Sequence, residues 1–370
     1  MRRPVVVLLG PSREAISGVT THLNGLLGSR LAARFELLHF QIGSEGRREH
    51  LLARLARLAA SPFLLAATML RAQAALLHIN TSLNHKAFWR DVIYLAVAKL
   101  CGTRVLCQVH GGRLDEFAGA RALFGALVHA SLRLADAVVV LSRAQQEAFR
   151  ARLPRQPVEV VPNGIDCAPY TRYNRAAADP GAPLRLIYFG RLAPAKGLLE
   201  TIEALRIARS HGVAARLVLA GSGPEEPRLR QYVRDAGLVR DVAFVGPAYG
   251  NHKAQLLAQA DVLVLASYGE GLPYSLLEAM AAGCVPIVTP VGAIPDVVSE
   301  GEHGLLVAPR DAQAVAVAIS RLAEDRAALA RMSAACRERI AAGYSLERVA
   351  RDFSALYWGL CAMPTPKAAT

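Results

Sequence analysis

Residues 261–283 constrain the fold more than any other stretch of the chain. Val262 to Ala266 form a continuous apolar run, which is typical of a strand buried on both faces of a parallel sheet. Ser267 to Pro273 contain two glycines and a proline, so this segment ends the strand in a turn. Tyr274 to Ala282 then predict a helix. Open α/β sheets bind ligands at the carboxyl ends of their strands, so the turn is a candidate binding loop.

The same order of strand, loop and helix recurs in both halves of the chain. ADAVVVLS at 135–142 and ADVLVLAS at 260–267 repeat one strand with the same flanking residues. Arg104 to Val109 and Leu184 to Phe189 are further predicted strands, and predicted helices alternate with them. This alternation favours an α/β fold with two doubly wound parallel-sheet, Rossmann-like domains facing across a cleft. A length of 370 residues also favours two domains over a single core.

Breaks in the pattern predict the domain boundaries. We expect an N-terminal domain over residues 1–165. Residues 166–183 should form a linker, because proline, glycine and polar residues interrupt every periodicity there. A C-terminal domain should occupy residues 184–343. Residues 344–370 should form a helix that packs back on the N-terminal domain, followed by a tail.

Composition indicates a globular protein whose first half meets an anionic partner. The chain is 53% hydrophobic and 20% charged, which excludes extensive disorder. Residues 1–170 carry 21 Lys and Arg against 11 Asp and Glu, whereas residues 171–370 carry 22 against 19. No helix-turn-helix, RNA-binding or zinc-finger pattern is present, so we expect no nucleic-acid partner. A phospholipid surface or a lipid phosphate is the favoured partner of the basic half.

Targeting and cysteine patterns favour the cytoplasm. The apolar run after Met1 is too short for a signal peptide, and no uncharged apolar run approaches the length of a bilayer-spanning helix. Six scattered cysteines without a C-x-x-C pair favour a reducing compartment and no zinc site.

Residues 47–75 are the part of the sequence that most resembles a membrane-contacting segment. Leucines at helical spacing alternate with arginines, a pattern typical of a basic amphipathic helix on anionic lipid. Ser61-Pro62 should begin a second, more apolar helix. The alternative is an ordinary helix packed on the sheet with its arginines outward. The residues of the pattern are Leu51, Leu52, Leu55, Leu58, Arg47, Arg48, Arg54 and Arg57.

Two residues of the first half lie where a ligand could bind. Gly18 precedes a helix predicted from about Val19, and a glycine there lets a phosphate approach the N-terminal amides. A plain turn glycine is the alternative. His110 follows a predicted strand and precedes two glycines, so we expect it to be exposed at the sheet edge. There it could donate a hydrogen bond to a ligand oxygen, although a purely structural histidine is also possible.

The second half places cations and carboxylates on separate loops. Arg191 and Lys196 share one loop and offer a planar fork and a mobile point charge to a diphosphate. Gly197 follows the lysine in place of Ser or Thr, so this is not a P-loop. Glu270 and Glu278 bracket the loop before the helix. Carboxylates that only accept hydrogen bonds, next to free amides, suit a nucleotide-linked sugar. The alternatives are surface cations and an exposed helix face carrying Glu278.

These motifs occur together in one order along the chain. G-R-x4-K-G begins at Gly190, A-G-S-G-P at Ala220 and E-G-L-P-Y-S-L-L-E at Glu270, and V-P-N-G-I-D begins at Val161. With the S-G-V loop and the H-G-G turn, they resemble glycosyltransferase family 4, the retaining enzymes of the GT-B fold. Ser17-Gly18 and Pro273-Tyr274 depart from the commonest residues of that family, which leaves the donor sugar open.

The resemblance implies that the N-terminal domain faces the acceptor or a membrane and that the C-terminal domain binds the donor. It also implies a role for each candidate residue. Arg191 and Lys196 would hold the donor diphosphate, and Glu278 the ribose hydroxyls. His110 would lie beside the reacting centre, and Gly18 would reach the phosphates. The donor sugar would be held by Glu270 with the loop Gly271, Leu272, Pro273 and Tyr274. The nucleoside would be bordered by Gly221, Ser222 and Gly223.

The expected activity is that of a retaining hexosyltransferase. The substrate would be a UDP- or GDP-sugar, with no cofactor and no metal, and the acceptor would be a hydroxyl of a lipid-linked glycan in bacterial polysaccharide or glycolipid assembly. The expected location is the cytoplasm, with contact at the anionic inner face of the plasma membrane. A sugar-nucleotide epimerase of the same fold and a non-catalytic subunit that binds a nucleotide sugar are the alternatives.

Overall fold

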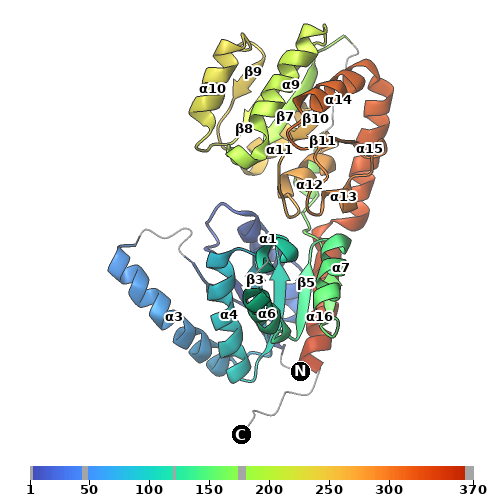
Figure 1. The fold of residues 1–370 in the computed structure, drawn as a ribbon. Coiled ribbons are helices and arrows are strands. Elements are labelled where there is room, and N and C mark those ends of the chain that lie inside the picture. The colour runs from blue at the N-terminus through green and yellow to red at the C-terminus, as the bar shows by residue number, and fades with distance from the viewer. Residues whose placement is uncertain (1–2, 44–48, 120–121, 174–180, 363–370) are drawn as a thin grey trace. The chain divides into compact units, whose positions relative to one another are not determined.

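The chain folds into two compact units, each built on one parallel sheet. The computed structural model describes residues 3–43, 49–119, 122–173 and 181–362 (Figure 1). Unit 1 comprises Met1–Gly164 with Leu346–Thr370, and unit 2 comprises Ile165–Ser345. Within the described residues each unit has a six-stranded sheet, and every strand pair is parallel. The predicted α/β class with two Rossmann-like sheets is confirmed.

Unit 1 has the strand order β2-β1-β3-β4-β5-β6. The order reverses direction at β1, so the topological switch point lies between β1 and β3. Its strands are β1 (Val5–Gly10), β2 (Glu36–Gln41), β3 (Leu76–Thr81), β4 (Arg104–Val109), β5 (Ala137–Val140) and β6 (Val158–Val160). Its helices are α1 (Gly18–Gly28), α2 (Leu31–Arg34), α3 (Leu51–Ala72), α4 (His85–Leu100), α5 (Leu114–Ala118), α6 (Ala122–Arg133), α7 (Arg143–Arg152) and α16 (Leu346–Ala362).

Alternating strand residues of unit 1 supply two separate cores, one on each face of its sheet. Val7 and Ile79 belong to a cluster that packs against α3, α4, α6 and α7. Leu8 and Leu106 belong to a second cluster that packs against α1, α2 and α16. The C-terminal helix α16 therefore completes the second core. The Tyr357 hydroxyl of α16 lies 2.6 Å from Nδ1 of His78 on β3.

Unit 2 has the strand order β12-β11-β10-β7-β8-β9, and its switch point lies between β7 and β10. Its strands are β7 (Leu184–Phe189), β8 (Ala215–Ala220), β9 (Val242–Phe244), β10 (Val262–Leu265), β11 (Val285–Val288) and β12 (Leu305–Leu306). Its helices are α8 (Ala168–Thr171), the 3-10 helix η1 (Pro194–Lys196), α9 (Leu198–Ser210), α10 (Glu226–Asp235), α11 (Gly250–Gln259), α12 (Tyr274–Ala281), α13 (Ile294–Val297), α14 (Ala312–Glu324) and α15 (Arg326–Gly343).

Helix α3 differs from the prediction because it does not break at Ser61-Pro62. It runs unbroken from Leu51 to Ala72 with Pro62 inside. Proline removes one hydrogen bond of the helix, but packing of Leu65 and Met69 in the core holds the turns that follow it. The buried Ser61 hydroxyl adds a contact at 2.8 Å to the hydroxyl of Tyr94 on α4. The predicted arginines 47 and 48 lie outside the described residues.

The outer face of α3 is apolar. Leu52, Leu55, Phe63 and Leu70 follow one another at helical spacing, and they are 81, 53, 77 and 62% exposed. Among the described helices, α3 alone has a length and apolar content that would allow it to cross a bilayer. Length and composition do not distinguish a helix that spans a membrane from one that lies along its surface.

Candidate functional site

The loops at the carboxyl ends of the unit 2 strands are hydrogen-bonded to one another in a row. The amide of Leu192, after β7, donates to the carbonyl of Ser222, after β8, at 2.9 Å. The amide of Tyr268, after β10, donates to the carbonyl of Ala195 at 2.9 Å. The loops after β8, β7 and β10 therefore form one continuous edge, centred on the switch point.

Glycines allow these loops to approach backbone to backbone. Gly197 has a φ of +63°, and a Cβ there would lie 2.0 Å from the carbonyl oxygen of Ala266. Gly221 and Gly223 are equally constrained, since a Cβ would lie 1.8 Å from the oxygen of Gly190 and 2.1 Å from that of Leu192. Each of the three positions requires a residue without a side chain.

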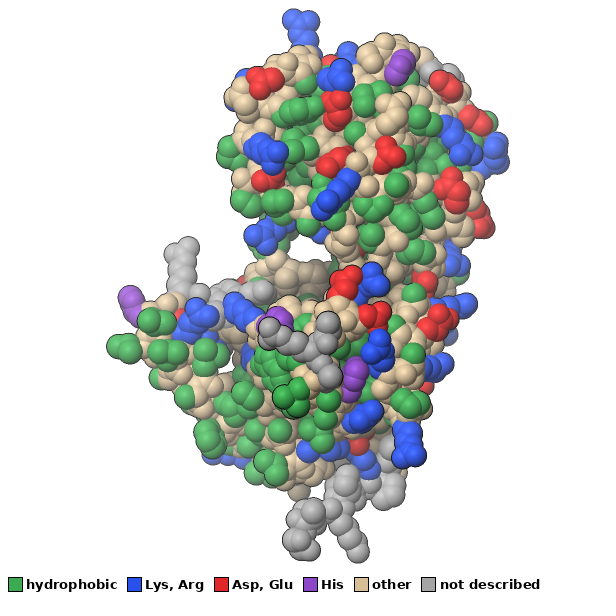
Figure 2. Space-filling view, viewed as in Figure 1, with side chains coloured by type: hydrophobic (Ala, Val, Ile, Leu, Met, Phe, Trp, Pro, Cys, Tyr) green, Lys and Arg blue, Asp and Glu red, His purple; other side chains and the backbone are tan. Residues whose placement is uncertain are grey.

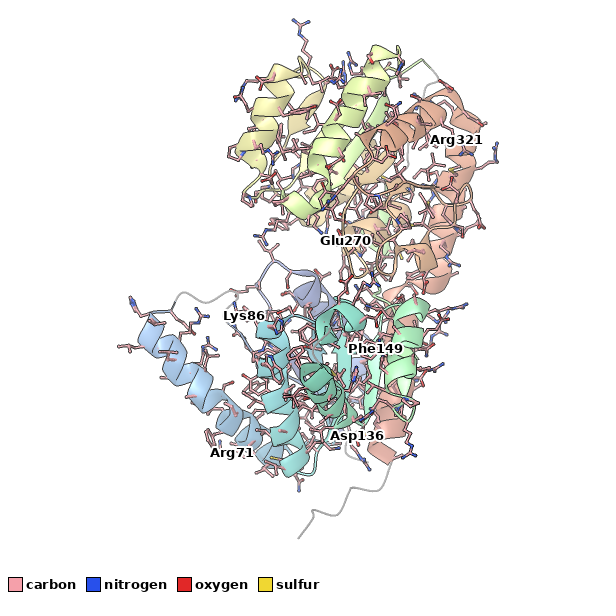
Figure 3. All side chains as sticks on the ribbon, viewed as in Figure 1. Arg71, Lys86, Asp136, Phe149, Glu270 and Arg321 are labelled. Atoms are coloured by element: carbon pink, nitrogen blue, oxygen red, sulfur yellow. The ribbon has the colours of Figure 1, made fainter. Side chains whose placement is uncertain are left out.

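Lys196 and Glu270, two of the predicted site residues, form an ion pair at this edge, and Figure 3 labels Glu270 there. Lys196 Nζ donates to Oε1 of Glu270 at 2.5 Å, and the two side chains are 26 and 11% exposed. Arg191 belongs to the same loop as Lys196 and is exposed. Within the described residues its guanidinium has no hydrogen bond or ion pair. The edge therefore carries one compensated charge pair and one uncompensated cation.

Glu278 is paired with a lysine that sequence reasoning missed. Lys253 Nζ, on α11, donates to Oε1 of Glu278, on α12, at 2.7 Å, and the side chains are 18 and 6% exposed. The ammonium also lies 5.2 Å from the ring centroid of Phe189. The Tyr170 hydroxyl is a further neighbour, and burial followed by the charge of Glu278 raises the pKa of Tyr170. The alternative of an exposed helix face for Glu278 is wrong.

The N-terminal end of α12 leaves polar groups unpaired. Pro273 occupies the N-cap and provides no side-chain hydrogen bond, so the first amides of the helix have no cap. The hydroxyls of Tyr274 and Ser267 are buried and have no hydrogen-bond partner among the described residues. Burial, reinforced by the charge of Glu278, raises the pKa of Tyr274 well above its ordinary value, so its hydroxyl remains a donor.

In unit 1, His110 is held by a buried amide. Its Nε2 lies 2.7 Å from Oδ1 of Asn80, whose Nδ2 donates to the carbonyl of Leu9 at 2.9 Å. Because the Asn80 oxygen can only accept, Nε2 of His110 carries the proton and Nδ1 of the neutral ring is an acceptor. His110 is partly buried, so the prediction of an exposed histidine is wrong.

His110 belongs to a cluster of three histidines in which His22 contacts both of the others. The rings of His22 and His110 lie 4.9 Å apart, and those of His22 and His78 lie 6.4 Å apart. Burial, followed by the nearby histidines, lowers the pKa of His110 well below its ordinary value. Burial also lowers the pKa of His22 to about 4 and that of His78 to about 3. All three rings are therefore neutral at pH 7. The one sequence signal was a histidine inside the apolar strand of residues 76–81.

Gly18 begins helix α1 and does not lie in a turn. Ser17 is the N-cap, and its hydroxyl accepts a hydrogen bond from the amide of Thr20 at 3.1 Å. The turn-glycine alternative is therefore wrong. Gly18 is exposed, as expected for a position where a ligand would meet the helix terminus. Gly18 and His110 belong to unit 1, whereas the residues of the loop edge all belong to unit 2.

Comparison with known proteins identifies the family. A model described as Glycosyltransferase Family 4 matches residues 27–169, and one described as Glycosyl transferases group 1 matches residues 183–325. This chain belongs to the family 4-like glycosyltransferases. Relatives of this family 4-like chain include a glycogen synthase of Mycobacterium tuberculosis, 34% identical over 54% of this chain and 48% of that protein. The chain spans about half the length of the first curated relatives it matches.

A second relative and a solved structure extend this similarity. The GDP-mannose:cellobiosyl-diphosphopolyprenol alpha-mannosyltransferase of Xanthomonas campestris is 29% identical over 62% of this chain and 61% of that protein. Anabaena HepE, solved in complex with UDP, superimposes with a TM-score of 0.78 over 97% of this chain and 100% of that chain. Its sequence identity is 18%, and the likeness shows the two-domain GT-B fold of the family 4-like chain.

Proposed function

We propose that the chain transfers a hexose from a nucleoside diphosphate sugar to a hydroxyl acceptor. One observation carries the proposal: Arg191, Lys196 and Glu270 lie on hydrogen-bonded loops at the switch point of unit 2. Cations at a sheet edge hold a diphosphate, and a carboxylate accepts hydrogen bonds from sugar hydroxyls. The UDP in the HepE complex supports a nucleoside diphosphate as the donor class.

The proposed chemistry begins with cleavage of the bond between the anomeric carbon and the diphosphate. Negative charge then develops on the leaving phosphate, where Arg191 and Lys196 would stabilise it. The acceptor oxygen would bond to the anomeric carbon on the face that the diphosphate leaves, which gives retention, and the leaving phosphate oxygen would take the proton of the acceptor hydroxyl. In this mechanism cations and backbone amides, in place of a metal ion, stabilise the leaving diphosphate, and no carboxylate acts as a nucleophile.

His110 would act as a neutral hydrogen-bonding group beside the donor sugar. Its pKa lies well below neutral pH because the ring is buried near two other histidines, so it adds no positive charge. The hydrogen bond to Asn80 fixes one ring orientation, which leaves Nδ1 to accept from a sugar hydroxyl.

The acceptor would be a saccharide linked to a lipid at the inner membrane face. The exposed apolar face of α3 is visible in Figure 2 as hydrophobic side chains over this helix. The helix also carries Arg54 and Arg71 near its two ends. Apolar side chains with arginines suit an anionic lipid surface. The name of the Xanthomonas relative contains a polyprenol-linked diphosphate, which supports this class of acceptor. Flotation with anionic liposomes tests the contact, and Leu52→Asp with Phe63→Asp should abolish it.

Donor binding and turnover test the main proposal. UDP- and GDP-sugars should be screened by thermal stabilisation and by slow hydrolysis, followed by Arg191→Ala and Lys196→Ala. Each substitution should weaken binding of the preferred donor about 10-fold or more, because it removes a charge-assisted hydrogen bond. Arg216→Ala is the matched control, since Arg216 is exposed near the amino end of β8.

The same screen separates the alternatives. Conversion of the donor to a stereoisomer without any acceptor would identify an epimerase, and tight binding without consumption would identify a non-catalytic subunit. Failure of every donor to bind would refute the proposal.

A further inference from the structure

Unit 1 contains a cavity of about 590 Å³ at its own switch point. The loop after β1, the end of β3 and the N-terminal ends of α1 and α4 contribute to its wall, and α3 contributes one side. This is the position at which an open α/β sheet binds its ligand, and the volume suits a sugar-sized molecule. Its polar lining includes Ser17, Arg54, Asn80, Asn84, Lys86 and Arg90.

The lining of this cavity is cationic. Arg54 and Lys86 are exposed, and neither side chain has a hydrogen bond or ion pair within the described residues. Arg90 binds Asp91 through two hydrogen bonds of 2.8 and 3.1 Å, so its charge is largely compensated. No aspartate or glutamate lines the cavity among the described residues. Two cations thus point to a ligand that carries negative charge.

The first turn of α4 adds to this preference. The helix has 16 residues, and the side chain of Asn84 caps one amide by accepting from Ala87 at 3.0 Å. Lys86 lies in this turn, so a cation and the positive end of the helix dipole lie on the same side of the cavity. Figure 3 shows Lys86 at this end of α4.

We propose that this cavity binds the acceptor through an anionic group, a phosphate or a carboxylate carried by the saccharide. The inference rests on the proposed function, because it assigns the cavity to the second substrate. Arg54 and Lys86 hold the anionic oxygens, while the side-chain amide nitrogen of the exposed Asn84 donates to a sugar hydroxyl. An uncharged saccharide would leave both cations without a counter-charge, so the site distinguishes anionic from neutral acceptors.

Binding of simple anions tests the cavity without any turnover. The full chain carrying Arg191→Ala and Lys196→Ala, which removes the diphosphate-binding cations of unit 2, is titrated by calorimetry with inorganic pyrophosphate and with glucuronate. At least one should bind. Stronger binding of pyrophosphate assigns a phosphate and stronger binding of glucuronate assigns a carboxylate, and either supports the site.

Substitutions locate the bound anion. Arg54→Gln or Lys86→Gln should weaken binding about 10-fold in that background, whereas Lys86→Arg should retain it. Arg71→Gln is the matched control, since Arg71 is exposed near the other end of α3, away from the cavity lining. The inference is overturned if neither anion binds, or if Arg71→Gln weakens binding as much as Arg54→Gln. These titrations measure anion binding and do not depend on donor turnover. The proposed glycosyl transfer and the proposed anion site can therefore fail independently of each other.

Discussion

The ion pair between Lys253 and Glu278 gives the sharpest test of how unit 2 is held together. Lys253→Met preserves the length of the side chain and removes its charge. At 2.7 Å and an effective dielectric constant near 20, the attraction between the two charges is about 6 kcal/mol. The cost of removing both charges from water offsets most of this. Truncating one partner of a buried pair nevertheless costs about 3–5 kcal/mol, because the other charge stays buried without its partner.

The expected loss lies at the lower end of that range. Lys253 is 18% exposed, so water can partly replace it beside Glu278, whose side chain is 6% exposed. We therefore expect local opening of α12 to become easier by about 3 kcal/mol, which raises its opening equilibrium on the order of 100-fold. Hydrogen–deuterium exchange of peptides from α12, followed by mass spectrometry, measures this equilibrium without requiring a two-state transition of the whole chain.

Two variants serve as controls. Arg321→Met breaks the exposed ion pair with Glu300, where the nitrogen and oxygen lie 3.7 Å apart and the side chains are 58 and 53% exposed, so it should change exchange by less than about threefold. Lys253→Met with Glu278→Met should regain much of the lost protection, because no buried charge remains. An increase below about threefold in Lys253→Met, or no recovery in the double variant, would show that other groups compensate Glu278.

Three further predictions concern both units. Partial burial raises the pKa of Asp136, but hydrogen bonds from a lysine, a backbone amide and an arginine outweigh it and leave the pKa below its ordinary value. The stability that these bonds provide is present at neutral pH and is lost as the pH falls below about 4. Chemical denaturation between pH 7 and pH 3 should therefore show a smaller decrease in stability for Asp136→Asn than for the unsubstituted chain. Gly197→Ala should lower the melting temperature and donor affinity because its Cβ would lie 2.0 Å from the oxygen of Ala266, whereas Gly212→Ala, with no atom within 4 Å of its Cβ, should cost only about 1 kcal/mol. Tyr357→Phe should cost about 2 kcal/mol in chemical denaturation, because Nδ1 of the buried histidine on β3 loses its partner.

The strands could be predicted because their signal is local. Arg104–Val109 and Leu184–Phe189 have the predicted bounds, since strands buried on both faces of a parallel sheet are continuous apolar runs. The course of α3 could not be predicted in the same way. Pro62 is a local signal for a break, and the packing of Leu65 and Met69 that overrides it depends on residues far away in the chain.

Some residues of the candidate site could be predicted from local signals, whereas others depend on tertiary packing. Lys196 and Glu270 follow two strands that flank the switch point, so strand prediction together with the parallel topology was enough to bring their loops together. Lys253 lies on a different helix from Glu278, and their contact depends on the tertiary placement of α11 and α12, which both contact α8. Likewise, His22 contacts His78 and His110 only because α1 covers the sheet at that point. No spacing in the sequence encodes such contacts.

The pairing of charges in unit 2 bears on how a donor would bind. Glu270 and Glu278 each form an ion pair with a lysine, so neither carboxylate is an uncompensated charge. A sugar hydroxyl that approaches Glu270 must share it with Lys196, and a diphosphate that approaches Lys196 must compete with Glu270. Arg191 has no such competitor among the described residues, so its whole attraction is available to the ligand. The edge can therefore remain ordered without a donor, and we expect Arg191→Ala to weaken donor binding more than Lys196→Ala.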